Sequence, residues 1–317
     1  MEKEVIKTFR TPNFTRREFA DIVWRRFAGH SKRNKKNVEH ICPKKEVFSK
    51  NKAINFGFTG DVMPIDKEFK ISSELKKFTK NMDYVIINLE GIITKKRRMW
   101  AEAHDESIIE NIKKEFPKSE IVIYCANNHS GDFGREEFNK SIAILEKHFK
   151  VFGTEEKPSI QIGNVNLCAV TFWSNQENSF TFEVSRDEKE AIKKINKQLK
   201  KDCFNILLPH WGDEMHLYPN KSQVAMADKL LEKWDSIVGN HPHCPQPVSV
   251  KKVKGKDKIV AYSLGDFCFK LNWKLFEKGA IVKLGISTGK SPVLTKVEHE
   301  NTRYKIKKNQ TFVSIEN

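Results

Sequence analysis

The stretch AINFGFTGD, residues 53–61, places a short apolar run directly before a glycine and an aspartate. The same arrangement, an apolar run followed by small, acidic, amide or imidazole residues, recurs in DYVIINLEG (83–91), EIVIYCANNH (120–129), CFNILLPHWGDE (203–214) and SIVGNHPH (236–243). Runs rich in Val and Ile without clean alternation are typical of strands that are covered on both faces. These five segments therefore predict the core strands of one α/β domain.

Segments with apolar residues at three- and four-residue spacing lie between these runs, at 138–149, 191–199 and 224–234. Helices placed between strands predict right-handed crossovers and a largely parallel or mixed sheet. After residue 236 the helical pattern stops, and the segments 259–264 and 280–286 and the last 30 residues favour strands. The order of elements predicts the α/β class.

The composition excludes several classes of protein. The chain has 317 residues and a formal net charge of +16, and no stretch approaches the 18 or so apolar residues of a membrane-spanning helix. The first 30 residues lack the apolar run of a secretory signal. None of the six cysteines is spaced as CxxC, so we expect buried thiols in a reducing cytoplasm and no zinc knuckle.

Residues 1–52 form a basic N-terminal arm, with 15 Lys and Arg against 6 Asp and Glu, ahead of a domain that we place at 53–317. Thr15 and Glu18 predict a capping box, and Phe19, Val23 and Phe27 recur at the four-residue spacing of an amphipathic helix. The helix at 14–28 either docks on its own domain or binds a membrane surface or a partner. The charge is not interleaved as an aromatic stacking platform, so we do not expect nucleic acid as the partner.

The carboxyl ends of strands in an open α/β sheet share one edge, where ligands bind. The five strand ends would bring acidic, amide and imidazole side chains to one rim: Asp61, Glu90, Asn128, His129, His210, His241 and His243. These groups suit divalent ions such as Mn, Fe or Zn. A single Gly-Asp or Asn-His pair is often only a turn or a helix cap, so the prediction of a metal site depends on the joint pattern.

Six blocks together resemble the bacterial capsule-synthesis proteins linked to poly-γ-glutamate, a CapA/PgsA-like family of the calcineurin-like metallophosphoesterase superfamily. The blocks are F-T-G-D-V-M, N-L-E-G, A-N-N-H-S-x-D-x-G, H-W-G-x-E, G-x-H-P-H-x-x-Q-P and S-L-G-D-F, and they occur in family order between about residues 53 and 290. The resemblance implies a four-layer α/β/β/α sandwich with two divalent metal ions at the strand ends.

The resemblance also implies roles for individual residues. The first metal ion would be bound by Asp61 and His243, the second by Asn128, His210 and His241, with Glu90 bridging the two and with His129 and Asp61 as catalytic residues. Further candidate ligands are Glu214, Asn127 and Asp266. Two positions depart from the pattern: Met63 stands where the superfamily usually carries a histidine, and Asp266 stands where the family usually has asparagine.

The activity implied by the resemblance is metal-dependent hydrolysis of a phosphoester or an acidic polymer during capsule or poly-γ-glutamate synthesis. The alternative is a non-enzymatic accessory subunit that holds metal and binds an acidic polymer or a synthase partner. In either case the helix at 14–28 could attach the protein to a synthase or to anionic lipid. We expect the protein in the cytoplasm, either free or peripheral at the inner face of the membrane.

Overall fold

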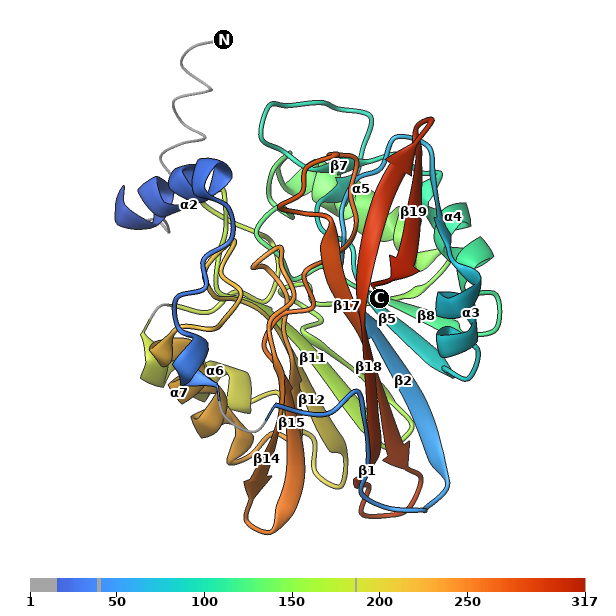
Figure 1. The fold of residues 1–317 in the computed structure, drawn as a ribbon, viewed down its shortest axis with the longest axis vertical. Coiled ribbons are helices and arrows are strands. Elements are labelled where there is room, and N and C mark those ends of the chain that lie inside the picture. The colour runs from blue at the N-terminus through green and yellow to red at the C-terminus, as the bar shows by residue number, and fades with distance from the viewer. Residues whose placement is uncertain (1–15, 39–40, 186, 317) are drawn as a thin grey trace.

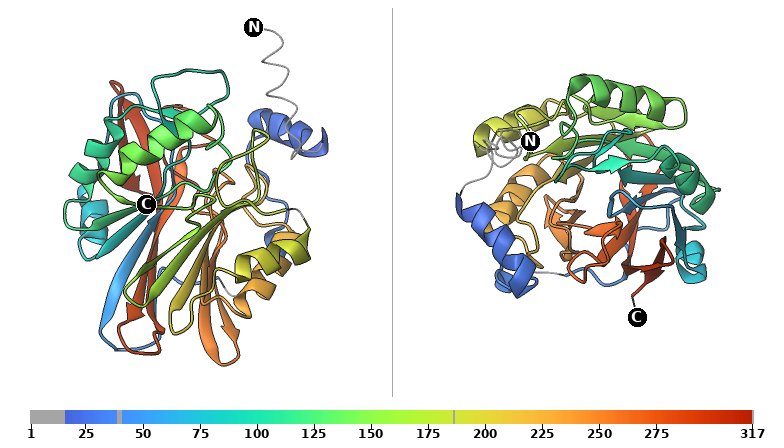
Figure 2. Two further views of the ribbon diagram at one scale, coloured as in Figure 1. Left: turned by 180° about the vertical axis from the view of Figure 1, so that it is seen from behind. Right: turned by 90° about the horizontal axis from the view of Figure 1, so that it is seen from above.

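Two β-sheets face each other, and helices cover the outer face of each sheet (Figures 1 and 2). The computed structural model describes residues 16–38, 41–185 and 187–316. Residue 15 and those before it, including the predicted cap Thr15, lie outside this part of the chain, as do the side chains of residues 16–19.

The larger sheet has nine strands in the order β4-β19-β18-β17-β2-β5-β8-β9, with β1 paired to β18. Its strands are β1 (Lys45–Val47), β2 (Ala53–Thr59), β4 (Glu68–Ile71), β5 (Tyr84–Asn88), β8 (Glu120–Tyr124), β9 (Lys150–Phe152), β17 (Lys278–Ser287), β18 (Leu294–Lys307) and β19 (Gln310–Ile315). Strands β2, β5, β8 and β9 are parallel, whereas β17 and β18 join antiparallel. Part of the predicted arm, β1, therefore belongs to the same sheet as the C-terminal strands.

The smaller sheet has six strands in the order β10-β11-β12-β13-β15-β14. They are β10 (Ser159–Ile162), β11 (Val165–Thr171), β12 (Phe204–His210), β13 (Ser236–Val238), β14 (Val248–Val253) and β15 (Lys256–Ala261). The four inner strands are parallel and the two edge strands are antiparallel. Two short pairs complete the strands: β3 (Asp61–Val62) with β16 (Asp266–Cys268), and β6 (Ile92–Ile93) with β7 (Ala103–His104).

The helices flank the sheets. They are α2 (Arg16–Ala28), the 3-10 turn η1 (Lys35–Asn37), α3 (Ser73–Thr79), α4 (Ile108–Glu115), α5 (Arg135–Glu146), α6 (Glu188–Asn196) and α7 (Lys221–Leu231). The predicted helices at 138–149, 191–199 and 224–234 are confirmed as α5, α6 and α7. Helices α3 and α4 were not predicted, since seven and eight residues are too few to show helical periodicity.

Alternate residues of the central strands pack into different layers. Ile86 of β5 and Ile206 of β12 belong to the core between the two sheets. Their neighbours point outward: Ile87 packs in the core that contains Ile112 of α4, and Leu207 in the core that contains Leu230 of α7. Three apolar cores between four layers confirm the predicted α/β/β/α sandwich.

Helix α2 docks on the domain through its polar side. The Asp21 carboxylate lies 2.7 Å from His216 Nε2, and His30 Nε2 lies 2.7 Å from the carbonyl oxygen of Leu275. The apolar side chains face away from the domain, with exposed fractions of 40% for Val23 and 83% for Phe27. The predicted docking of the helix on its own domain therefore occurs, but not through the apolar stripe. No helix among the described residues is long and apolar enough to cross a membrane.

Glu298 of β18 forms ion pairs with two lysines whose contribution to the stability of the larger sheet can be tested. Its Oε2 lies 2.9 Å from the ammonium groups of Lys283 and Lys296. Burial alone would raise the pKa of Glu298, but the two lysines outweigh it and lower that pKa from 4.5 to about 2. A lowered pKa stabilises the fold above pH 4.5, and this contribution is lost as the pH falls toward 2.

We therefore expect Glu298→Gln to lower the free energy of unfolding at pH 7 by about 1 kcal/mol and to flatten its decline below pH 4.5. Urea denaturation at several pH values measures both effects. Glu300→Gln, on the same strand and paired with Lys44, is the matched control and should keep the wild-type pH profile. An unchanged acid profile in Glu298→Gln would contradict this account of the sheet.

Candidate metal centre

The predicted residues meet where the strands of both sheets end, because two tight turns allow the backbones to approach. A Cβ atom on Gly60, just before Asp61, would lie 2.4 Å from the carbonyl oxygen of Gly265. Gly91, just after Glu90, has a φ of +102° and equally little space. Only glycine fits such positions without strain. The Gly-Asp and Glu-Gly pairs in the sequence are therefore required by the backbone.

Asp61 is held in one orientation by its neighbours. Its Oδ1 accepts hydrogen bonds from the amide groups of Asn88, at 2.6 Å, and Asn240. Its Oδ2 accepts one from the backbone N–H of His241 at 3.2 Å. Asp61 is fully buried, and burial raises the pKa of its carboxyl group. The hydrogen bonds oppose that rise and keep the carboxylate aimed at the centre.

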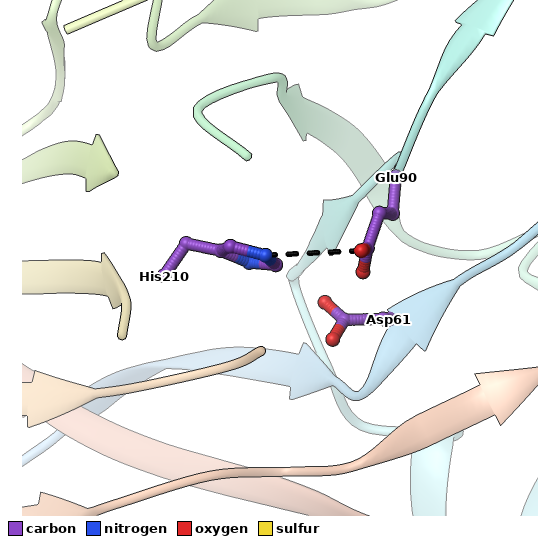
Figure 3. Close-up of side chains that lie close together, drawn as sticks. All are labelled: Asp61, Glu90 and His210. Atoms are coloured by element: carbon purple, nitrogen blue, oxygen red, sulfur yellow. Dashed lines mark ion pairs between the residues drawn. The ribbon is translucent and has the colours of Figure 1, made fainter. Parts of the chain in front are cut away.

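Glu90 lies at the middle of the site, close to Asp61 and His210 (Figure 3). Its Oε1 is 3.8 Å from His210 Nε2, 3.9 Å from His243 Nε2 and 4.0 Å from His129 Nε2. These separations are too long for hydrogen bonds. Within the described part of the chain no group donates a hydrogen bond to either carboxylate oxygen, although Glu90 is fully buried. Burial and the neighbouring Asp61 raise the pKa of Glu90 well above its usual range.

The three histidines of the two strand ends have different environments. Burial lowers the pKa of His210 and of His241 well below the usual range, so both imidazoles are neutral and each has one ring nitrogen with a lone pair. Burial acts in the same direction on His243, but Asp266 and Glu90 outweigh it and raise the pKa of His243. His210 Nε2 lies 3.2 Å from His241 Nδ1 and 2.7 Å from the amide oxygen of Asn128.

The His241-Pro242-His243 segment has a strained backbone. His241 and His243 have φ values of 103° and 53°, which residues other than glycine rarely adopt. The ring of Trp173 stacks on His241 with centroids 5.6 Å apart. Such strain is retained where the surrounding structure holds it, most often at functional sites.

Asp266 joins the site through the pairing of two short strands. Strand β16 runs beside β3, so that Asp266 is opposite Asp61, and Asp266 Oδ1 lies 2.9 Å from His243 Nδ1. Burial raises the pKa of Asp266 to about 6. Met63, in contrast, is buried in the apolar core. Met63, at the position where the superfamily usually carries a histidine, therefore offers no ligand atom, whereas Asp266 does offer one to the site.

His129 forms a pair with an aspartate that sequence reasoning did not single out. His129 Nδ1 lies 2.7 Å from Asp132 Oδ2, which also accepts a hydrogen bond from the backbone N–H of Glu102 at 3.0 Å. Burial would lower the pKa of His129, but Asp132 outweighs it and raises that pKa. The i, i+3 spacing of the two residues was the available signal.

The remaining candidates differ in position. Asn128 keeps its amide oxygen toward His210. Both polar atoms of Asn127 are engaged in holding the loop: its amide group donates to Asn88 and the Leu89 carbonyl, and its oxygen accepts from the backbone N–H of His129 at 3.1 Å. Glu214 lies with His241 on the wall of an adjoining cavity and is not part of either potential ligand group among the described residues.

Several site residues were not predicted. Asn88 and Asn240 stand inside the quoted blocks, but sequence spacing does not distinguish a ligand from the residue that orients it. His104, whose Nε2 lies 2.9 Å from the carbonyl oxygen of Glu90, and Trp173 lie outside every block, so the sequence carried no signal for them.

The chemistry of the donors fits divalent cations. Two overlapping groups, Asp61–Glu90–His210 and Asp61–His243–Asp266, each place their ligand atoms within 4.8 Å of one another. They combine carboxylate oxygens with imidazole nitrogens, the set that suits Mn, Fe or Zn. A cation would satisfy the two oxygens of Glu90 and the Oδ2 of Asp266, which are buried without a hydrogen bond from the described residues.

The fold and the site together define a four-layer α/β/β/α protein with a candidate metal centre at its strand ends. A sequence model of the family described as "Bacterial capsule synthesis protein PGA_cap" matches residues 55–271. The chain belongs to this family, and the resemblance seen in the sequence blocks is confirmed.

Two curated relatives are similar along most of the chain. The PGA biosynthesis protein CapA of Bacillus subtilis (strain 168) is 25% identical over 297 residues, which cover 84% of this chain and 77% of the relative. The capsule biosynthesis protein CapA of Bacillus anthracis is 24% identical over 291 residues, covering 81% and 69%.

Similar solved structures include the calcineurin-like phosphoesterase YfkN from Bacillus subtilis, with a TM-score of 0.46, 12% identity and coverage of 79% of this chain and 90% of that one. A putative 5'-nucleotidase from Staphylococcus aureus in complex with alpha-ketoglutarate has a TM-score of 0.47, 11% identity and coverage of 81% and 56%. These likenesses are weak, and the four-layer architecture is established by the packing itself.

Because its carboxylate is buried, we expect Glu90→Gln to change thermal stability in opposite directions in the absence and in the presence of metal. In metal-free protein Glu90→Gln should raise the melting temperature, because it removes an unsatisfied buried acid beside Asp61. Added Mn²⁺ should stabilise wild type by about 2–3 kcal/mol at roughly 100 times its dissociation constant, and the variant much less. Differential scanning fluorimetry with and without chelator measures both.

Glu115→Gln is the matched control. Glu115 is equally buried but is satisfied by the backbone N–H of Ile71 and by Lys76. This control should be destabilised without metal and should keep the full response to Mn²⁺. A Glu90→Gln variant that is destabilised in the same way would contradict the metal assignment.

Proposed function

We propose that the protein is a divalent-metal-dependent hydrolase that acts on a phosphoester or an acidic polymer in capsule or poly-γ-glutamate synthesis. The observation that carries this proposal is the Glu90 carboxylate, which is buried, receives no hydrogen bond from the described residues and is approached by three imidazoles within 4.0 Å. A purely structural carboxylate in such a position would be expected to have its hydrogen bonds satisfied.

In this proposal two groups of side chains would hold the cations. Asp61, His243 and Asp266 form one group, and His210, His241 and Asn128 form the other, with Glu90 between them. When bound, the two ions would supply a nucleophilic water at neutral pH and polarise a phosphoryl or carbonyl oxygen. Asn88 and Asn240 keep the Asp61 carboxylate oriented.

His129 supplies the proton for the leaving group in the proposed reaction. Its hydrogen bond to Asp132 places one proton on Nδ1 and favours a second proton on Nε2, which is the nitrogen that faces Glu90. A protonated imidazole beside the reacting bond acts as a general acid. Asp132 holds the ring and does not contact Glu90 itself.

The proposed substrate class is supported by the family and by the names of the relatives, which connect those proteins to PGA and capsule biosynthesis. Both names support an acidic polymer, or a phosphorylated precursor of one, as the substrate here. The alternative, a non-enzymatic subunit that holds metal and binds a synthase partner through residues 14–28, predicts metal binding without turnover. All six cysteines are free thiols, which supports the cytoplasm as the compartment.

If His129 is the general acid, the loss of kcat on its removal should depend on the leaving group of the substrate. With Mn²⁺ present, His129→Ala should reduce kcat for an alkyl phosphodiester, a poor leaving group, by about 10²–10⁴-fold. For a nitrophenyl phosphodiester the loss should be much smaller, because that leaving group needs no proton. Steady-state kinetics with both substrates measure the difference.

His148→Ala is the control, since His148 lies on the surface beside Lys113 and should leave both rates unchanged. Asp132→Asn should follow His129→Ala in direction with a smaller loss. Absence of turnover on phosphodiester and γ-glutamyl substrates with Mn²⁺, Fe²⁺ and Zn²⁺, in protein that is folded and binds metal, would contradict the hydrolase and leave the accessory role.

A further inference from the structure

Exposed apolar side chains gather at one end of the molecule. Among the described residues, seven of the eleven exposed large hydrophobic side chains lie on three segments. They are Val23, Trp24 and Phe27 of α2, Met99 and Trp100 of the loop at 95–100, and Leu271 and Trp273 of the loop at 271–274. We call these three segments the apolar rim. Large exposed apolar patches on proteins mark sites of interaction.

One arginine connects the three segments of the rim. The guanidinium of Arg26, on α2, lies 5.1 Å from the ring centre of Trp100 and 5.8 Å from that of Trp273. Its Nε is buried without a hydrogen-bond partner among the described residues, and both indole rings contribute cation–π contacts to it. Figure 1 shows α2, β7 and the loop before β17 at the same end of the molecule.

Each segment of the rim also reaches the metal centre. Trp24 of α2 and His241 line the same cavity of about 470 Å³. Arg98 donates to the carbonyl oxygen of Asp132 at 3.1 Å. The ring of Trp273 is 5.8 Å from that of Phe276, which lies 5.5 Å from the ring of His243. The three segments of the rim therefore lie next to residues of the candidate metal centre.

The same surface carries positive charge. Lys95 and Lys274 are exposed and have no ion-pair partner within the described residues. Arg97 donates hydrogen bonds to the carbonyl oxygens of Thr94 and Lys96, and the carboxylate of Asp105 interacts electrostatically with Arg97 and Lys95. Tryptophans beside lysines and arginines are the composition that binds at the interface of a bilayer with anionic head groups. An acidic polymer in water would satisfy the charges but would leave the indole and phenyl rings in water.

We propose that the apolar rim binds the surface of an anionic lipid bilayer, with the candidate metal centre opening toward the membrane. The proposal extends the contact surface beyond the helix at 14–28 to two loops of the domain. It concerns binding alone and is independent of whether the centre hydrolyses its ligand, so a variant such as Asp61→Asn should bind lipid like the wild type.

Flotation of the purified full chain with vesicles tests this proposal. The probes are vesicles of phosphatidylcholine alone and vesicles with about one third phosphatidylglycerol. Wild type should float only with the anionic vesicles, and binding should weaken as salt is raised. Lys95→Gln combined with Arg97→Gln should weaken binding at least about ten-fold, since each charge near the surface contributes about 1 kcal/mol.

Variants of the apolar side chains test whether the three segments act together. Trp24→Ser with Phe27→Ser, and separately Trp100→Ser with Trp273→Ser, should each reduce flotation by ten-fold or more. Val293→Ser with Phe312→Ser is the matched control, because these exposed apolar residues lie outside the rim. Circular dichroism and the Mn²⁺-induced rise in melting temperature verify that each variant is folded.

Several results would overturn the proposal. They are no binding to anionic vesicles, equal binding to neutral vesicles, and wild-type binding by the Trp100/Trp273 variant. Binding of soluble polyglutamate through the same residues, without any vesicle binding, would assign the surface to an acidic polymer instead.

Discussion

The incomplete compensation of buried acidic groups is the constraint on which the site depends. Glu90, Asp61 and Asp266 are all buried, and no described residue donates a hydrogen bond to either oxygen of Glu90. Buried carboxylates are costly unless positive charge or hydrogen bonds compensate them. The surrounding amides are used on Asp61, His243 pairs with Asp266, and the imidazoles of His210 and His241 are neutral, so Glu90 is left without a hydrogen bond from the described residues. Divalent cations would complete the compensation.

The two-sheet architecture is what allows such a cluster to be assembled. Asp61 and Glu90 follow strands of the larger sheet, whereas His210 and His241 come from the smaller one. The apolar core between the sheets fixes their separation, and turns at Gly60 and Gly91 bring the backbones close enough. The metal centre therefore depends on packing between layers as well as on the ligands themselves.

The sequence predicted this convergence because the carboxyl ends of parallel strands meet at one edge, a rule that needs no knowledge of long-range contacts. The apolar runs that open the segments 53–61 and 120–129 correspond to the observed strands β2 and β8. The face through which α2 docks was not predictable in this way. Its apolar stripe indicated a buried face, but Asp21 and His30 find partners on the domain that only the tertiary fold brings near. The role of Asn127 likewise depends on partners that sequence spacing does not reveal.

Metal content tests the central claim most directly. Elemental analysis of protein purified under mild conditions should find two equivalents of divalent metal per wild-type chain. Asp61→Ala and His241→Ala should each lose at least one equivalent, since the proposal places Asp61 in one group of ligands and His241 in the other. No bound metal in folded wild-type protein, even after incubation with Mn²⁺, Fe²⁺ and Zn²⁺, would contradict the account.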